Sequence, residues 1–262
     1  MMKLKWSFKN LEFFESLRIA KANIGKSGLM LLFDVSFFAS FYYIIPLLFE
    51  YIASKITPSQ TQTFLFLVLL MSVGYLLLMT LVYSFFKYSL LEIVKSLFQK
   101  KSFSFARLWN FCLMNIIIIL PTFLIFNAVL GGVKEAYRPY AFVLLGIPVS
   151  LLLYAAINIS HSLFYEGASL KKSLKAGFNV TFSKIHIYKE QIGAFALAGI
   201  SLWALFLIFG FALRSFTSQN YTLYLSAYSY LTNAEYIISY LVFYFVIFVN
   251  RISFYRILRE MK

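Results

Sequence analysis

The sequence predicts an all-α, polytopic membrane protein with six transmembrane helices. Hydrophobic residues make up 61% of the chain and charged residues only 13%. The apolar residues come in blocks of about twenty, which is typical of membrane proteins because a bilayer core about 30 Å thick needs about that much helix. Residues 1–262 are therefore expected to form a single transmembrane domain.

Six segments are long and apolar enough to cross a bilayer, and their order along the chain defines the connections. They cover residues 28–53, 63–86, 111–130, 141–164, 192–213 and 234–250.

The distribution of lysine and arginine predicts how these spans face. Twenty of the 24 basic residues lie in the N-terminal segment, the second and fourth connections and the C-terminal tail. The other four are Lys55, Lys134, Arg138 and Arg214. Because cytoplasmic loops carry the excess of basic residues, both termini are expected in the cytoplasm and the protein in the cell membrane.

A polar, basic segment, residues 165–189, separates the fourth and fifth predicted spans. As a helix it has Lys172 and Lys175 on one side and, on the opposite side, an apolar stripe of Leu170, Leu174, Phe178, Thr181, Phe182 and Ile185. Such a helix beside membrane spans is expected in the interface, with its lysines among anionic headgroups. The alternative is a connector whose apolar stripe packs on the bundle.

Similar basic stretches begin at Glu15, Glu92 and Glu166, which are 77 and 74 residues apart. Each precedes an odd-numbered span, so the sequence suggests an interfacial helix plus a two-span hairpin, used three times. The units would be residues 9–86, 87–164 and 165–250, followed by a cytoplasmic tail, 251–262. The candidate residues for binding lipid or a protein partner are the lysines of the second and third stretches, Lys95, Lys100, Lys101, Lys171, Lys172 and Lys175.

Three polar residues inside the predicted spans are candidates for an ion or proton pathway, because ionisable groups at membrane depth often mark function. Asp34 lies in the first span, and Asn158 and His161 lie one helical turn apart in the fourth. In a small-molecule or ion transporter, or a permease subunit, Asp34 would need a partner across the bundle such as His161. Alternatively, these groups reach water, headgroups or a nearby lysine.

Other classes of function are disfavoured. The net charge of +14 comes from residues at helix ends and short loops, which argues against nucleic-acid binding. The sequence has two histidines, one cysteine, no Gly-x-Ser-x-Gly turn and no Walker-type phosphate loop. We therefore expect no enzyme activity, no catalytic or metal site and no cofactor.

Glu166, the Ser169-Leu170 pair, Ser173 and Gly177 form a short pattern just before a span. In this pattern and in its six spans the chain resembles prokaryotic YciC-like proteins and the membrane domain found beside glycerophosphodiester phosphodiesterases. The phosphodiesterase barrel and its metal ligands are missing, so that activity is not implied. The expected function is a membrane-embedded interaction or lipid-organising module whose basic amphipathic helices meet anionic lipids or a protein partner at the cytoplasmic face.

Overall fold

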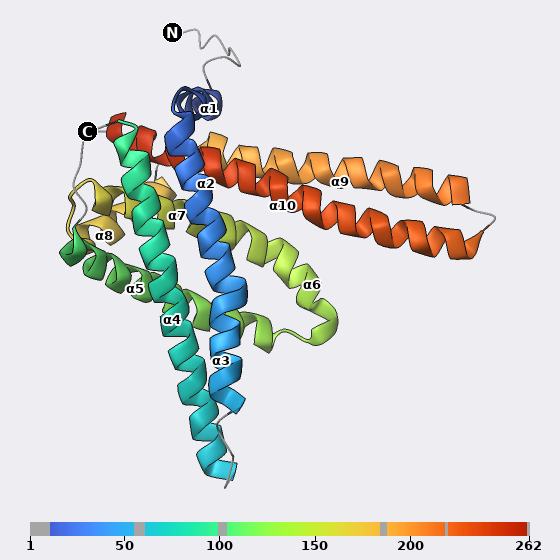
Figure 1. Cartoon of the computed structure of the whole chain (residues 1–262), viewed down its shortest axis with the longest axis horizontal. Helices are drawn as coiled ribbons and strands as arrows, with labels where there is room; N and C mark the ends of the chain where they lie inside the picture. Colours follow the sequence, from blue (N-terminus) through green and yellow to red (C-terminus); the bar gives the residue numbers. More distant parts are fainter. Residues whose placement is uncertain (1–10, 55–60, 99–103, 184–187, 218–219, 261–262) are drawn as a thin grey trace. The chain divides into compact units, whose positions relative to one another are not determined.

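The computed structural model describes residues 11–54, 61–98, 104–183, 188–217 and 220–260, and within these ranges it contains helices and no strand (Figure 1). Contacts between Cα atoms divide the chain into two compact units. The larger unit is Lys21–Ser183, and the smaller one combines Met1–Ala20 with Lys184–Lys262.

Six helical segments within the described ranges are long and apolar enough to span a bilayer, which confirms the predicted all-α, polytopic class. Each overlaps one of the six segments expected from the sequence. They are Ile24–Ile52, Phe66–Ser96, Phe105–Phe126, Glu135–Tyr165, Lys189–Thr217 and Tyr221–Arg259.

The larger unit contains four of these spans and one amphipathic helix. Its helices are α2 (Ile24–Ala39), η2 (Ser40–Ile44), α3 (Ile45–Ser54), α4 (Thr61–Ser96), α5 (Phe105–Gly132), η3 (Glu135–Tyr137), α6 (Arg138–Ala141), η4 (Phe142–Gly146), α7 (Ile147–Tyr165) and α8 (Leu170–Ser183). Helix α4 packs against α2 and α5, and α7 packs against α8.

The core of this unit lies where the C-terminal parts of α4 and α7 meet the first half of α5. Its buried members are Tyr88, Leu91, Phe111, Met114, Ile118, Phe164 and Tyr165. Leu170 and Leu174 of α8 pack against this cluster, so the amphipathic helix is part of the folded unit.

Two of the spans contain a π-helical turn just before a proline. In η2 the N–H of Ile45 donates to the carbonyl of Ser40, and in η4 the N–H of Ile147 donates to that of Phe142, five residues back. Pro46 and Pro148 follow directly. A proline ring clashes with the carbonyl four residues earlier, and the wider turn relieves this clash while the helix continues.

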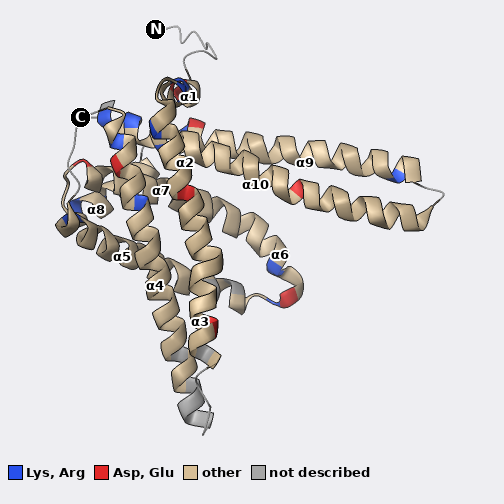
Figure 2. Cartoon of the chain, viewed as in Figure 1, with Lys and Arg blue, Asp and Glu red and all other residues tan. Residues whose placement is uncertain are grey.

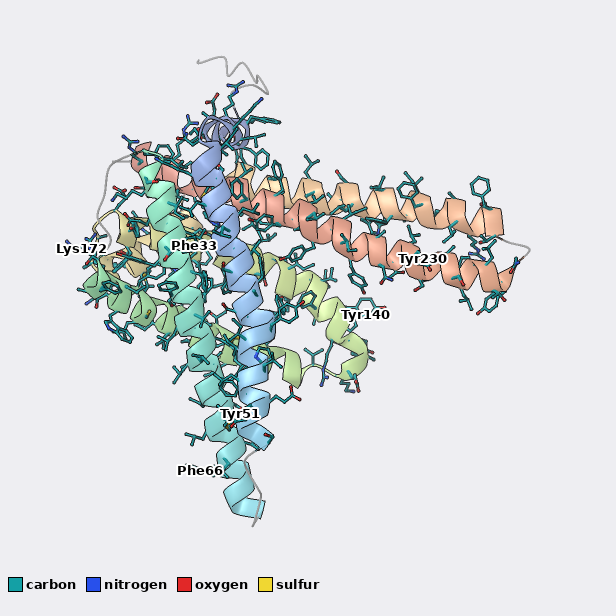
Figure 3. The ribbon with its side chains drawn as sticks, in the orientation of Figure 1. Phe33, Tyr51, Phe66, Tyr140, Lys172 and Tyr230 are labelled. Atoms are coloured by element: carbon teal, nitrogen blue, oxygen red, sulfur yellow. The ribbon has the colours of Figure 1, made fainter. Side chains whose placement is uncertain are left out.

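The outside of the larger unit is apolar over most of its length. Figure 3 shows Phe66 on α4 and Tyr140 on α6, and both side chains are more than half exposed. Along α4 no charged residue occurs before Lys87, so the charges of this helix are confined to its last third (Figure 2). A large apolar surface of this kind is expected where lipid chains, and not water, surround the helices.

The smaller unit is built on a pair of antiparallel helices, α9 (Lys189–Thr217) and α10 (Tyr221–Glu260), which lie side by side (Figure 1). Near the start of α9, Gln191 Nε2 donates to Ser253 Oγ at 2.5 Å, and Asn250 Nδ2 donates to the carbonyl of Gln191 at 3.0 Å. Helix α1 (Glu12–Ala22) contributes Glu12, whose carboxylate lies 3.6 Å from the Arg256 guanidinium.

The end of the chain, expected as a cytoplasmic tail, is helical. Residues 251–260 continue α10, and Ile252 and Tyr255 are completely buried. The helix continues because residues 221–260 contain no glycine or proline, so nothing ends it at the first arginine of the expected tail. The same continuity makes residues 221–233, which lie between the fifth and sixth predicted spans, the first turns of α10.

Two of the three predicted interfacial segments form helices of their own, α1 and α8. The segment that begins at Glu92 does not, because residues 92–96 are the last residues of α4. Ile93, Val94 and Lys95 are buried there.

Candidate functional site

The exposed lysines of α8 form the candidate site, and the turn before this helix fixes its position. The N–H of Ala168 donates to the carbonyl of Leu163 at 3.2 Å, and that of Gly167 donates to Phe164 at 3.0 Å. This is the Schellman pattern that ends a helix, and it needs a left-handed residue. Gly167, with φ of 111°, supplies it.

Helix α8 packs on α7 through small side chains. Ser173, Gly177 and Thr181 are buried and follow one another at four-residue spacing, so they lie on one side of the helix. A Cβ added at Gly177 would overlap Ser160 Oγ on α7 and would lie 3.0 Å from Ser160 Cα. The two helices therefore meet at the level of their backbones.

On its other side, α8 exposes Lys171, Lys172 and Lys175. Figure 3 shows Lys172 at the outer edge of the helix. The expected apolar stripe is divided: Leu170 and Leu174 pack on the core, whereas Phe182 is 68% exposed. Both expected roles of the segment are thus compatible, since one side packs on the bundle and the lysines stay accessible.

Lys95, expected at the lipid surface, is buried between α4 and the turn that follows α7. Its ammonium lies 3.3 Å from Glu166 Oε1 and 5.4 Å from the centre of the Tyr165 ring, and it donates to the Tyr165 carbonyl at 3.3 Å. The side chains of Lys95 and Glu166 are each only 8% exposed. Lys95 therefore ties α4 to the α7–α8 turn. Lys100 and Lys101 lie outside the described residues.

A directed chain of hydrogen bonds crosses from α7 to α4 through α5. Asn115 Nδ2 donates to Ser84 Oγ at 2.9 Å, and Ser84 donates to the Thr80 carbonyl at 2.6 Å. The amide oxygen of Asn115 lies 2.7 Å from His161 Nε2. Because this oxygen can only accept a hydrogen bond, we assign the imidazole proton to Nε2. His161 Nδ1 is buried and has no hydrogen-bond partner among the described residues.

Two of the three candidates for an ion pathway, Asn158 and His161, have hydrogen-bond partners on different helices. Asn158 accepts a hydrogen bond from Lys87 Nζ at 2.8 Å and donates to the Tyr154 carbonyl, also at 2.8 Å. His161, one turn further along α7, bonds to Asn115 and not to Asp34. Asp34 is buried in α2, with 4% of its surface exposed. The hydrogen bonds of Asn158 and His161 join α7 to α4 and α5.

Replacing Asn115 with leucine is expected to lower the free energy of unfolding by about 1–2 kcal/mol. The variant removes the hydrogen-bond partner of His161 and the donor to Ser84, and both of these side chains are buried. Thermal unfolding of the purified protein in detergent would measure the loss. Ser54→Leu is the control, since Ser54 is exposed on α3 and donates to the Tyr51 carbonyl of its own helix. An equal loss in the control would contradict the role of the chain.

Within the described residues, no three His, Cys, Asp or Glu side chains are placed to hold a metal ion. Comparison of the chain with models of known families, with curated proteins and with solved structures finds no match. The resemblance to YciC-like proteins accordingly stays a prediction. What the site offers chemically is positive charge held on a fixed helix.

Proposed function

We propose that this is a non-catalytic, multi-pass protein of the cell membrane, with both termini in the cytoplasm, that binds anionic lipid headgroups through α8. One observation carries the proposal: α8 exposes Lys171, Lys172 and Lys175 while its opposite side is locked on α7 by Gly177. Because the helix is already folded and packed, lipid binding would not lose conformational entropy in ordering it.

The chemistry of α8 suits the headgroup region of a membrane. Lys171 and Lys175 are four residues apart and therefore neighbours on the helix surface, with Lys172 beside them. Each lysine near an anionic surface contributes about 1 kcal/mol of attraction. The exposed Phe182 on the same helix can enter the boundary between headgroups and acyl chains.

The basic residues of the chain also support this orientation. The connection that contains α8 is one of those with the excess of lysine and arginine, and the cytoplasmic leaflet is the one that carries anionic lipid. The prediction that α8 faces the cytoplasm thus agrees with the proposal that it binds anionic lipid.

Reversing the charge of these three lysines together, Lys171→Glu, Lys172→Glu and Lys175→Glu, is expected to weaken phosphatidylglycerol binding about 100-fold, from the loss of about 3 kcal/mol. Native mass spectrometry of the protein in mild detergent, with phosphatidylglycerol added in steps, measures the bound fraction. Phosphatidylcholine binding should not change.

The matched control reverses the same number of charges elsewhere, at Lys134, Arg138 and Arg214, all of which are exposed. Its binding of phosphatidylglycerol should equal that of the unmodified protein. If both triple variants lose binding equally, net charge and not α8 is responsible, and the proposal fails. If the native sample carries a protein partner that only the α8 variant loses, the lysines dock protein and not lipid.

A further inference from the structure

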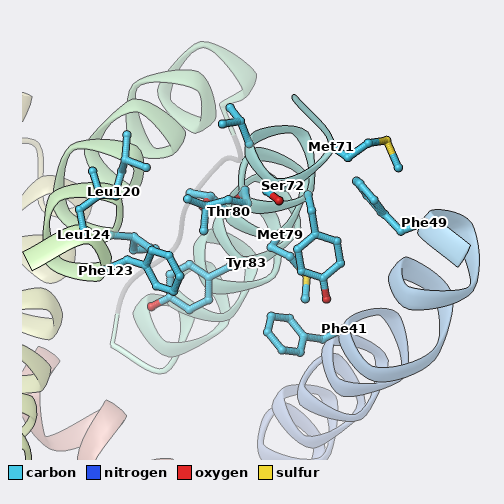
Figure 4. Close-up of a pocket in the computed structure, with 14 residues that line it drawn as sticks. Phe41, Phe49, Met71, Ser72, Met79, Thr80, Tyr83, Leu120, Phe123 and Leu124 are labelled. Carbon is cyan, nitrogen blue, oxygen red and sulfur yellow. The ribbon is translucent and has the colours of Figure 1, made fainter. Parts of the chain in front are cut away.

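A cavity of about 830 Å³ lies in the larger unit, bounded by α4, α5 and the segment formed by η2 and α3 (Figure 4). Its lining is mostly apolar and aromatic. It includes Phe41 and Phe49 from η2 and α3, Met79 and Tyr83 from α4, and Phe123 and Leu124 from α5.

Ring contacts join the walls of the cavity at two levels. Phe49 meets Tyr75 edge to face, with 4.7 Å between the ring centres, and Phe37 meets Tyr83 at 6.1 Å. The two tyrosines are eight residues apart on α4, so the contacts are about 12 Å apart along the helix. Between them lies Phe41, which lines the hollow.

The serine and threonine hydroxyl groups in the lining already donate hydrogen bonds. Ser72 Oγ donates to the carbonyl of Val68, and Thr80 Oγ1 donates to that of Leu76, both at 2.8 Å. These donors are thus satisfied within α4. An occupant without hydrogen-bonding groups leaves neither of them unpaired, and such an occupant is hydrocarbon.

The location and length of the cavity point to the same occupant. All its lining residues belong to three segments that can span a bilayer, where acyl chains are the surrounding medium. The lining on α4 runs from Met71 to Tyr83, about 18 Å at 1.5 Å per residue. One leaflet contributes about half of the 30 Å hydrocarbon core, so this length suits a single chain.

We infer that the cavity binds one acyl chain of a membrane phospholipid. This site is separate from α8 and is recognised by hydrocarbon and not by charge, so it goes beyond the proposed headgroup binding. The volume lies within the range of pockets that bind small-molecule ligands, and the methionine side chains of the lining adapt to a flexible chain.

The test uses the full chain in phosphatidylcholine vesicles that contain a small fraction of phosphatidylcholine with a photoreactive diazirine midway along one acyl chain. After irradiation, peptide mass spectrometry locates the adducts. We expect adducts at Met71, Met79 and Phe123 in the lining. Adducts at Leu70 and Leu77, which are exposed on α4 outside the cavity, measure labelling by the surrounding lipid.

Leu76→Trp fills the cavity, whereas Leu77→Trp places the same side chain on the neighbouring exposed surface. We expect Leu76→Trp to lower labelling of the lining about tenfold and Leu77→Trp to leave it unchanged. Ser72→Phe, also in the lining, is the second filling variant should Leu76→Trp fail to fold. Lining labels that survive filling, while labels at Leu70 stay unchanged, would overturn the inference. So would crosslinks between two copies of the chain at these positions.

Discussion

Replacing Gly177 with leucine is expected to lower the free energy of unfolding by about 3 kcal/mol or more, and Gly177→Ala by about 1–3 kcal/mol. A Cβ at this position would overlap Ser160 Oγ and would lie 2.9 Å from Ser160 Cβ and 3.0 Å from its Cα. A hydroxyl could rotate away, but the backbone of α7 could not, so α8 would have to move off α7. Thermal unfolding in detergent measures the effect.

The same contact supplies a rescue and a control. Ser160→Gly removes the obstructing side chain, and its hydroxyl has no hydrogen-bond partner among the described residues. Gly177→Ala should therefore cost less in the Ser160→Gly background than alone. Gly193→Ala, in α9 with no atom within 4 Å of the added Cβ, should be neutral or slightly stabilising. If Gly177→Ala behaves like Gly193→Ala, α8 does not pack on α7 as described.

Loss of the α7 contact is expected to weaken lipid binding as well as to lower stability. The lysines of α8 are held in place by Gly177 on the opposite side of the helix, so the leucine variant should weaken phosphatidylglycerol binding although no charge is changed. The charge-reversal variant should weaken binding without lowering stability, since the buried side of α8 stays intact.

The fold class could be predicted because hydropathy is a property of each segment alone. Blocks of apolar residues mark spans wherever they occur, and all six were found. The ends of the spans could not be predicted as well from hydropathy. The apolar block ends at Asn250, but a helix continues past a basic residue such as Arg251 when the following side chains, such as Ile252 and Tyr255, can be buried.

The close approach of α8 to α7 through small side chains could not be predicted from hydropathy. Hydropathy emphasises large apolar residues such as Phe182, which is exposed, and gives little weight to Ser173, Gly177 and Thr181, which are buried. The available signal was the four-residue spacing of small side chains, which lets two helices approach closely.

Side-chain contacts between residues distant in the sequence could also not be predicted from local sequence patterns. Lys95 looks like its neighbours Lys100 and Lys101 in a basic stretch, and nothing local shows that Glu166 lies beside it. The same holds for Asn115, which binds His161 from 46 residues away. A basic residue inside a run of large apolar side chains, here Ile93 and Val94, was the one hint that Lys95 is buried.

Replacing Lys95 with methionine is expected to cost about 3–5 kcal/mol of stability, because it removes the cation beside a carboxylate that is itself buried. Glu166→Gln should cost less, since the ammonium keeps its hydrogen bond to the Tyr165 carbonyl and its place over the Tyr165 ring. In the double variant neither charge is left, so the loss should be smaller than the sum of the two single losses. Thermal unfolding of all three variants in detergent gives the comparison.

Arg18→Met is the control for an ion pair at the surface. Arg18 Nη1 lies 2.5 Å from Glu15 Oε1, closer than Lys95 to Glu166, but the Arg18 side chain is 58% exposed. Water screens such a pair, so its loss should cost only about 0–1 kcal/mol. The same variants decide between two roles for Lys95. A stable Lys95→Met protein that no longer binds phosphatidylglycerol would restore Lys95 to the lipid site expected from the sequence. A destabilised one that still binds the lipid below its unfolding temperature would confine headgroup binding to α8.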